Sequence, residues 1–284
     1  MTTGTNPDEG ADEPLDVYAL RTAVLRPAGG WTALDVVAST GSTNADLLAE
    51  AGRGAPDRSV LIAEEQVRGR GRLDRTWTSR PGAAITMSVL WRPEGVPADR
   101  LGWLPMLAGV ALVDAVTEVA PGLPAALKWP NDLLAGPSRG KAAGILAEMT
   151  AVSGGGPGVV LGIGLNVATP PHELPWGATS LAAHGLSATR AEVVVALLGH
   201  LYLREAEWRD AGGDADACGL RSDYRSRCAS LGSRVRVERP GGDHLVGMAE
   251  DVDPQGRLLV HLENGDRVAV AAGDIVHLRA ADHP

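Results

Sequence analysis

Arginine and glycine dominate one short segment of the sequence, residues 64–77. It reads Glu-Glu-Gln-Val-Arg-Gly-Arg-Gly-Arg-Leu-Asp-Arg-Thr-Trp, with few apolar side chains to anchor it. The glycines allow backbone N–H groups to approach an anion closely, and Arg70, Arg72 and Arg75 can neutralise phosphate and carboxylate oxygens. Such a loop could assist a carboxylate that attacks the α-phosphate of ATP. On composition alone, an RNA-binding loop or a solvated basic loop fits equally well.

Lysine is almost absent from this chain. Of its 26 Lys and Arg residues only Lys128 and Lys141 are lysines. A compact ammonium is needed where a planar guanidinium fork would not fit, so both become candidate site residues, although codon bias would give the same count. Lys141 begins an apolar run, where its ammonium could bridge a carboxylate and an α-phosphate.

Two further polar clusters end apolar runs. Lys128-Trp-Pro-Asn-Asp132 places Asn131 and Asp132 where they suit ATP oxygens and a Mg²⁺ ion, although Pro-Asn-Asp is also common turn chemistry. Gly162-Ile-Gly-Leu-Asn166 embeds one amide in an apolar strand, where a ligand or a structural hydrogen bond would satisfy Asn166.

The remaining patterns predict the elements that hold these residues. Short apolar runs at 60–63, 83–91, 125–129, 142–148 and 159–167 predict core strands, and 99–120 and 190–209 have helical spacing. Thr43 and Asp46 resemble a capping box that opens a short helix after Ser42-Thr-Asn. From residue 231 the period changes to two, with a hairpin turn at Asn264-Gly265, which predicts a small barrel. We expect a disordered tail at 1–14 and domains at 15–229 and 230–284.

Composition excludes several classes of protein. A net charge of −9 argues against a nucleic-acid coat or an anionic membrane surface as partner. No uninterrupted apolar stretch of membrane length and no basic leader region are seen, so we expect a cytoplasmic protein. Cys218 and Cys228 lack disulfide or zinc spacing. Hydrolase, zinc-protease and dinucleotide motifs are missing from the sequence.

Taken in order, five motifs closely resemble those of biotin–protein ligases. They are Ser42-Thr-Asn, Gln66-x-x-Gly-Arg-Gly-Arg, Lys128-Trp-Pro-Asn-Asp, Gly140-Lys-x-x-Gly-Ile-Leu-x-Glu and Gly162-Ile-Gly-Leu-Asn. The resemblance covers the chain from about Trp31 onward. It implies an α+β catalytic domain related to class II aminoacyl-tRNA synthetases, with a mixed β-sheet flanked by helices, followed by an SH3-like β-barrel.

The resemblance also implies an activity. ATP and biotin would form biotinoyl-5′-AMP in the presence of Mg²⁺, and the lysine of a biotin carboxyl carrier domain would then accept the biotin. The site residues that it implies form two overlapping sets. Biotin would contact Ser42, Thr43, Asn44, Gln66, Arg70, Gly71, Arg72 and Lys141. ATP would contact Arg72, Arg75, Trp77, Asn131, Asp132 and Asn166, with Lys141, Arg70 and Arg72 catalytic and Asp132 holding the metal.

Further expectations concern the loop sequence, DNA binding, the oligomeric state and the alternative functions. Leu73-Asp74 stands where a glycine often precedes the final arginine of the family's loop. The segment before Trp31 is too short for a DNA-binding domain, so we expect ligase activity without repression and no nucleic-acid partner. The oligomeric state is left open between a monomer and a weak dimer. A lipoate–protein ligase and a nonenzymatic nucleic-acid or regulatory module remain the alternatives.

Overall fold

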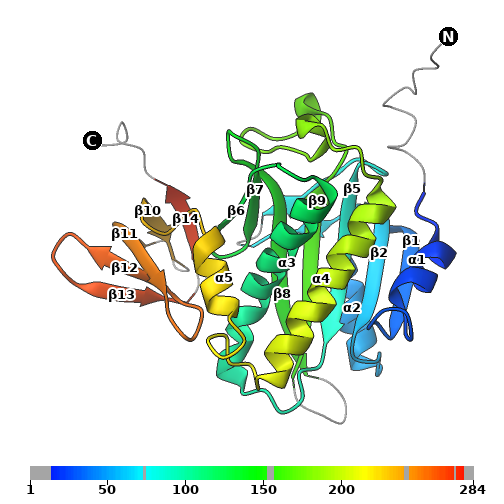
Figure 1. Cartoon of the computed structure of the whole chain (residues 1–284), viewed down its shortest axis with the longest axis horizontal. Coiled ribbons are helices and arrows are strands. Elements are labelled where there is room, and N and C mark those ends of the chain that lie inside the picture. Colours follow the sequence, from blue (N-terminus) through cyan, green and yellow to red (C-terminus); the bar gives the residue numbers. More distant parts are fainter. Residues whose placement is uncertain (1–13, 73–74, 152–156, 240–242, 272, 278–284) are drawn as a thin grey trace.

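Seven strands form one mixed sheet at the centre of the larger unit (Figure 1). The computed structural model describes residues 14–72, 75–151, 157–239, 243–271 and 273–277; the predicted tail, apart from Pro14, and the Leu73-Asp74 departure lie outside this part. The strand order is β1-β2-β5-β9-β8-β7-β6, with β1 and β2 parallel and all other neighbours antiparallel. The strands are β1 Ala33–Thr40, β2 Ser59–Gln66, β5 Ala84–Trp91, β6 Ala125–Lys128, β7 Asp132–Ala135, β8 Gly140–Ala151 and β9 Pro157–Asn166. The predicted mixed sheet is confirmed.

Helices cover both faces of this sheet. On one face α3 (Leu104–Val119), preceded by the 3₁₀ turn η1 (Ala98–Trp103), packs against α4 (Arg190–Asp210) and the sheet. On the other face α2 (Thr43–Gly52) packs over β5 and β9 with Leu47 and Ala51 buried. The predicted capping box at Thr189 is present and starts α4. The shorter elements are α1 (Val17–Val24), α5 (Leu220–Arg227), η2 (Pro171–Glu173) and η3 (Ala182–His184).

The packing helix is more apolar than the sequence analysis expected. Residues Ala98–Val119 together are long and apolar enough to span a membrane. However, 67% of the apolar window is buried inside the protein, with Leu107, Val110 and Leu112 fully covered. Its apolar character is therefore accounted for by burial between the sheet and α4.

The start of α2 corrects one prediction. Ser42, not Thr43, is the N-cap, because its hydroxyl accepts a hydrogen bond from the Ala45 N–H and its backbone is extended. Thr43 and Asn44 are thus the first helical residues and are buried. Asp46 accepts a hydrogen bond from the Thr40 hydroxyl instead of closing a capping box. The polar triplet is held rigidly at a helix start, facing the sheet.

The C-terminal unit is a five-stranded antiparallel sheet in the order β13-β12-β11-β10-β14. Its strands are β10 Arg234–Glu238, β11 His244–Val252, β12 Leu258–Leu262, β13 Arg267–Val270 and β14 Asp274–His277. The strands that the period of two predicts after residue 231 are present. Val235, Val237 and Val260 are fully buried, as the period of two requires.

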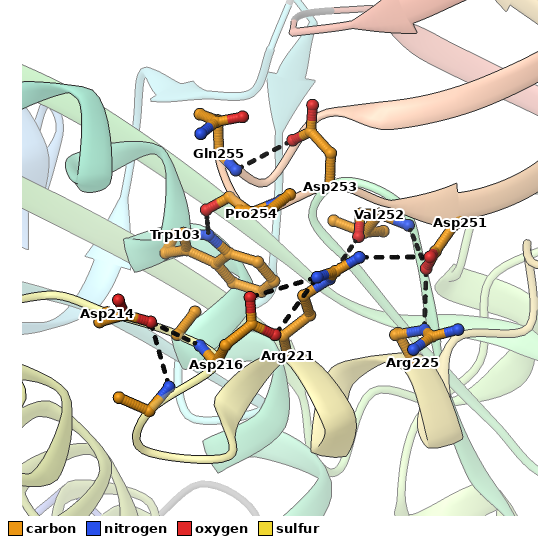
Figure 2. A network of polar contacts seen from close by, with 12 residues as sticks. Trp103, Asp214, Asp216, Arg221, Arg225, Asp251, Val252, Asp253, Pro254 and Gln255 are labelled. Carbon is orange, nitrogen blue, oxygen red and sulfur yellow. Dashed lines mark hydrogen bonds and ion pairs between the residues drawn. The ribbon is translucent and has the colours of Figure 1, made fainter. Parts of the chain in front are cut away.

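The turn between β11 and β12 joins this sheet to the larger unit (Figure 2). Arg221 of α5 donates through Nε to the Val252 carbonyl at 2.7 Å, and Trp103 donates through Nε1 to the Pro254 carbonyl at 2.8 Å. Arg225 Nε lies 2.8 Å from Asp251 Oδ1. These contacts fix the end of β11 and the following turn against α5 and η1 of the larger unit.

Candidate active site

One cavity of about 360 Å³ collects every site residue that the family resemblance implied. Lys128, the second candidate lysine, is not among the residues that line it. It lies on the α2 face of the sheet, against β5, β9, β8 and β7. The assigned residues that line it are Ser42, Thr43, Asn44, Gln66, Arg70, Gly71, Arg72, Arg75, Trp77, Asn131, Asp132, Lys141 and Asn166. These come from five separate stretches of the chain, which the fold brings to one place.

Small residues form the floor of this cavity. Strand register aligns Thr86, Gly164, Gly144 and Asp132 in one row across β5, β9, β8 and β7. Because side chains alternate along a strand, Gly162 and Asn166 lie on the same face of β9 as Gly164, one row to either side. Glycine in the middle of a buried strand offers no side chain to pack, and here it leaves room above the sheet.

Trp77 lies directly on this floor. A Cβ atom at position 164 would be 2.3 Å from Trp77 Cε2, so only glycine allows the indole to lie where it does. The neighbouring Gly144 has its nearest contacts with the same ring and with Lys141 Nζ. Trp77 is held by the two-residue pairing of β3 (Gly69–Arg70) with β4 (Thr76–Trp77). This pairing folds the arginine-rich part of the chain, residues 64–77, back on itself; we call it the arginine segment. Its Nε1–H is buried with no hydrogen-bond partner in the described part of the chain.

A hydrogen-bonded polar cluster closes one end of the cavity. Gln66 Oε1 accepts from the Thr43 backbone N–H at 2.9 Å, and Asn44 Nδ2 donates to Glu148 Oε2 at 2.8 Å. Ser88 of β5 lies beneath both α2 residues. A Cβ atom at position 162 would be 2.3 Å from Asn44 Oδ1, so the motif glycine permits this approach.

Cations and carboxylates face each other around the rest of the wall. Lys141 Nζ lies 2.7 Å from Asp132 Oδ1, and Arg70 Nη1 lies 3.8 Å from Glu148 Oε1. The Lys141 pair connects neighbouring strands, and the Arg70 pair connects the arginine segment to the sheet. The cations are thus fixed in position by carboxylates that an anionic ligand could replace.

The arginine segment also reaches the C-terminal sheet. Arg75 Nη2 lies 2.5 Å from Asp274 Oδ2, and Arg72 Nη2 donates to the Gly273 carbonyl at 2.9 Å. Burial lowers the pKa of Arg72, and the carboxylates of Asp274 and Asp132 oppose this shift. The guanidinium still remains a cation at neutral pH.

The two remaining amides are oriented by backbone carbonyls. Asn131 Nδ2 donates to the Ile145 carbonyl at 2.8 Å, and Asn166 Nδ2 donates to the Thr179 carbonyl at 3.1 Å. The structural hydrogen bond considered for Asn166 is therefore real. Each of these bonds uses the amide nitrogen and does not engage the side-chain carbonyl oxygen, and both side chains line the cavity.

Several residues around the cavity were not predicted as site residues. Asp274 is about two hundred positions along the chain from the arginine segment, and no local sequence pattern around Asp274 indicated a site. Glu148 ends a quoted motif and Ser88 lies inside an apolar run, yet neither was given a role. A signal was available for Ser88, because a lone hydroxyl in a continuous apolar strand needs a partner.

Comparison with known proteins gives matches to two family models. Residues 36–166 match the biotin/lipoate A/B protein ligase family, and residues 230–278 match the biotin protein ligase C terminal domain. Together they cover the cavity-forming strands and the C-terminal sheet.

Named relatives and solved structures agree with these matches. The chain is 48% identical over 270 residues to the biotin–[acetyl-CoA-carboxylase] ligase of Mycobacterium tuberculosis, covering 94% of this chain and 97% of the relative. It is 33% identical over 236 residues to a bifunctional ligase/repressor, BirA, of Bacillus subtilis, covering 81% and 69%. The biotin protein ligase of Aquifex aeolicus, solved with biotin and ATP, has the same fold at a TM-score of 0.72 and 24% identity, covering 88% of this chain and all of that one. The chain belongs to the biotin–protein ligase family.

Proposed function

We propose that this protein is an ATP-dependent ligase that attaches biotin to a biotin carboxyl carrier domain. The proposal rests on membership of the family, on high identity to a relative named as a biotin–[acetyl-CoA-carboxylase] ligase, and on a cavity of suitable chemistry. Biotin's carboxylate attacks the α-phosphorus of ATP, diphosphate leaves, and biotinoyl-5′-AMP forms. The acceptor lysine amine then attacks the acyl carbon, and AMP leaves.

The position of Lys141 is the observation that carries this proposal. Its ammonium lies beside Gly144, in the same row as Gly164. On β9, Gly164 lies between Gly162 and Asn166. Gly162 lies under Asn44 at one end of the cavity, and Asn166 lies at the opposite end. A cation at the middle of the cavity can attract the carboxylate from one end and the α-phosphate from the other, and so lower the repulsion between them.

The polar end suits the biotin ring system. Ser42, Thr43, Asn44 and Gln66 are held by α2 and the end of β2, and the first three are buried. A ureido ring presents two N–H donors and one carbonyl, which need fixed acceptors and donors. We assign the four side chains to this ring.

The opposite end suits ATP. Asn131 and Asn166 line the cavity with side-chain carbonyl oxygens that their backbone hydrogen bonds do not engage, and Trp77 offers an aromatic face to the adenine. Arg72 and Arg75 supply the charge for phosphates, while Arg70, Gly71 and Arg72 close over the bound ligand. Lys141, Arg70 and Arg72 form the catalytic set.

Mg²⁺ fits this end only as a metal that arrives with the nucleotide. Among the described residues no group of three or more His, Cys, Asp or Glu side chains gathers into a metal site. Asp132 provides one buried carboxylate, and Mg²⁺ commonly takes one carboxylate together with phosphate oxygens and water. Asp132 would hold the ion, which neutralises phosphate charge when bound.

The carrier and the compartment follow from the same chemistry. We propose the carrier subunit of a biotin-dependent carboxylase such as acetyl-CoA carboxylase as the acceptor. The two cysteines are free thiols, which fits a reducing compartment that contains ATP, and we place the reaction in the cytoplasm.

The alternatives from the sequence analysis have weaker support. A lipoate–protein ligase shares one of the matched family models, but the C-terminal model and the relative with 48% identity are both named for biotin. A nonenzymatic binding module does not explain an ammonium at the centre of a cavity.

Exchange of labelled diphosphate into ATP tests the activation step alone. With Mg²⁺ present, we expect exchange that depends on biotin and is absent with lipoate or with no acid. Exchange driven equally by lipoate, or none with biotin, would overturn the proposed function.

A further inference from the structure

A chain of buried hydrogen bonds runs beneath the polar end of the cavity, from Glu148 to Thr43. Asn44 Nδ2 lies 2.8 Å from Glu148 Oε2 and 3.2 Å from the Leu146 carbonyl oxygen. Ser88 Oγ lies 2.6 Å from Asn44 Oδ1 and 2.7 Å from Thr43 Oγ1. Ser88 is fully buried and Asn44 and Thr43 are 4% exposed, so water does not compete for the two Ser88 bonds, whereas the Glu148 side chain is 27% exposed.

The first link fixes the orientation of the Asn44 amide. A carboxylate and a backbone carbonyl only accept hydrogen bonds, so the NH₂ group of Asn44 must face them. Its Oδ1 then faces Ser88 and can only accept. The single hydroxyl proton of Ser88 is therefore used on Asn44.

The second link fixes the Thr43 hydroxyl. Ser88 has no proton left for Thr43, so the Thr43 hydroxyl uses its own proton on one of two acceptors, Ser88 Oγ at 2.7 Å or Gln66 Oε1 at 3.2 Å, and the shorter contact is the one to Ser88. The remaining lone pairs of Thr43 Oγ1 are left to accept. Gln66 is oriented in the same way, because its Oε1 faces the Thr43 backbone N–H and its NH₂ group is left as a donor.

We propose that Glu148 and Ser88 are positioning residues that set the hydrogen-bond polarity of the biotin end. Acting through Asn44, they hold the Thr43 hydroxyl as an acceptor, so the site favours a ring that presents an N–H at that point. A ureido ring does so, and a dithiolane ring does not. The inference rests on the proposed function, since it assigns the specificity of that same site.

Glu148 has a second contact that any experiment must separate. Its Oε1 lies 3.8 Å from Arg70 Nη1, so a change at Glu148 also affects the arginine segment. Ser88 does not touch that segment, which makes it the cleaner variant. Glu250, which pairs with Arg267 on the C-terminal sheet, offers a matched carboxylate far from the cavity.

Calorimetric titration of the full-length protein with biotin alone tests the inference. We expect Ser88→Ala and Glu148→Gln each to weaken biotin binding about tenfold, and the double variant to lie within about twofold of the weaker single variant. The reason is that both changes break one chain. Glu250→Gln is expected to bind like the parent, and all variants to keep its thermal midpoint.

A kinetic readout separates positioning from general damage. For Ser88→Ala we expect a raised KM for biotin with little change in kcat, because Lys141 is untouched. Additive losses of about a hundredfold in the double variant, or parent-like binding in either single variant, would overturn the inference. A parent that does not bind biotin at all would instead contradict the proposed function.

Discussion

Asp132 Oδ1 and Lys141 Nζ are 2.7 Å apart on neighbouring strands, so the central cation of the cavity has a carboxylate partner within the protein. The pair fixes where the ammonium lies. Under the proposed function, a ligand phosphate would compete with that carboxylate for the ammonium, and Asp132 would then be available to a metal ion. A point charge on a flexible stem can change partners in this way more readily than a planar guanidinium.

Lys141→Arg is therefore expected to lower kcat/KM at least tenfold, a loss of about 1.4 kcal/mol of transition-state stabilisation. The planar guanidinium fork does not reproduce the point charge that Lys141 Nζ places beside Gly144 and Asp132. Steady-state diphosphate release measures the loss, with the thermal midpoint checked in parallel. Unchanged turnover would mean that codon bias, and not a need for an ammonium at position 141, explains why lysine is rare in this chain.

Arg75→Gln should raise the KM for ATP by about tenfold, because it removes a phosphate-binding charge and the link to Asp274. The chain offers a close control in Arg267, which has the same 59% side-chain exposure and the same 2.5 Å separation from a carboxylate. Arg267→Gln should leave the KM for ATP unchanged. Equal effects of the two variants would mean that charge alone matters, wherever it is placed.

Hydrogen exchange of peptides covering Gly69–Arg75 should slow when biotin and ATP are added, because a charged, glycine-rich segment gains partners from the ligand. Asp274→Asn is expected to speed exchange of these peptides in the absence of ligand. Glu250→Gln serves again as the control. Equal protection with and without ligand would refute the closing role of the segment.

Gly164→Ala tests the floor of the cavity. The added Cβ would lie 2.3 Å from Trp77 Cε2, so the indole must move. We expect the KM for ATP to rise about tenfold or more. Gly199→Ala is the control, because a Cβ at that position in α4 meets nothing within 4 Å. A parent-like KM in Gly164→Ala would contradict the role of Trp77 at the ATP end.

His277 predicts a pH dependence of stability. Burial, together with the charges of Lys128 and Arg139, lowers the pKa of its imidazole below the ordinary value. The folded protein therefore binds a proton less readily than the unfolded chain, whose histidine has a pKa of about 6.5. The stability contributed by neutral His277 is present above that pH and is lost as the pH falls through the folded value.

Urea midpoints at pH 8 and pH 5.5 measure this dependence. His277→Gln should show a smaller fall in midpoint between the two than the parent. His261→Gln, at an exposed position on β12, should behave like the parent. A parent-like fall in His277→Gln would show that other groups cause the pH dependence.

Most of the fold could be predicted because its signals are local. Continuous apolar runs such as 83–91 mark central strands, and the Thr189 capping box marks the start of α4. The start of α2 was misassigned by one residue, since serine and threonine are both common N-cap residues. In the structure the Ser42 hydroxyl accepts from the Ala45 N–H, whereas Thr43 contacts Gln66. α1 was not predicted, although Asp16 caps it and Leu20 and Val24 lie four residues apart on its buried face.

The site was predictable as a set of motifs but not as a network. Each motif could be read separately, whereas the pairing of Arg75 with Asp274 depends on how the C-terminal sheet docks. Similarly, the role inferred for Ser88 depends on the register of β5 with β9 and on the position of α2 above them. Contacts of this kind join residues far apart in sequence, and spacing along the chain cannot reveal them.

Mass spectrometry of an isolated carrier domain tests the central claim most directly. The purified protein would be incubated with the carrier, ATP and Mg²⁺, and given biotin, lipoate or neither acid. We predict that the carrier gains the mass of one biotinoyl group on its acceptor lysine only when biotin and ATP are both present. A carrier that gains no mass with biotin, or that gains a lipoyl group instead, would contradict the assignment.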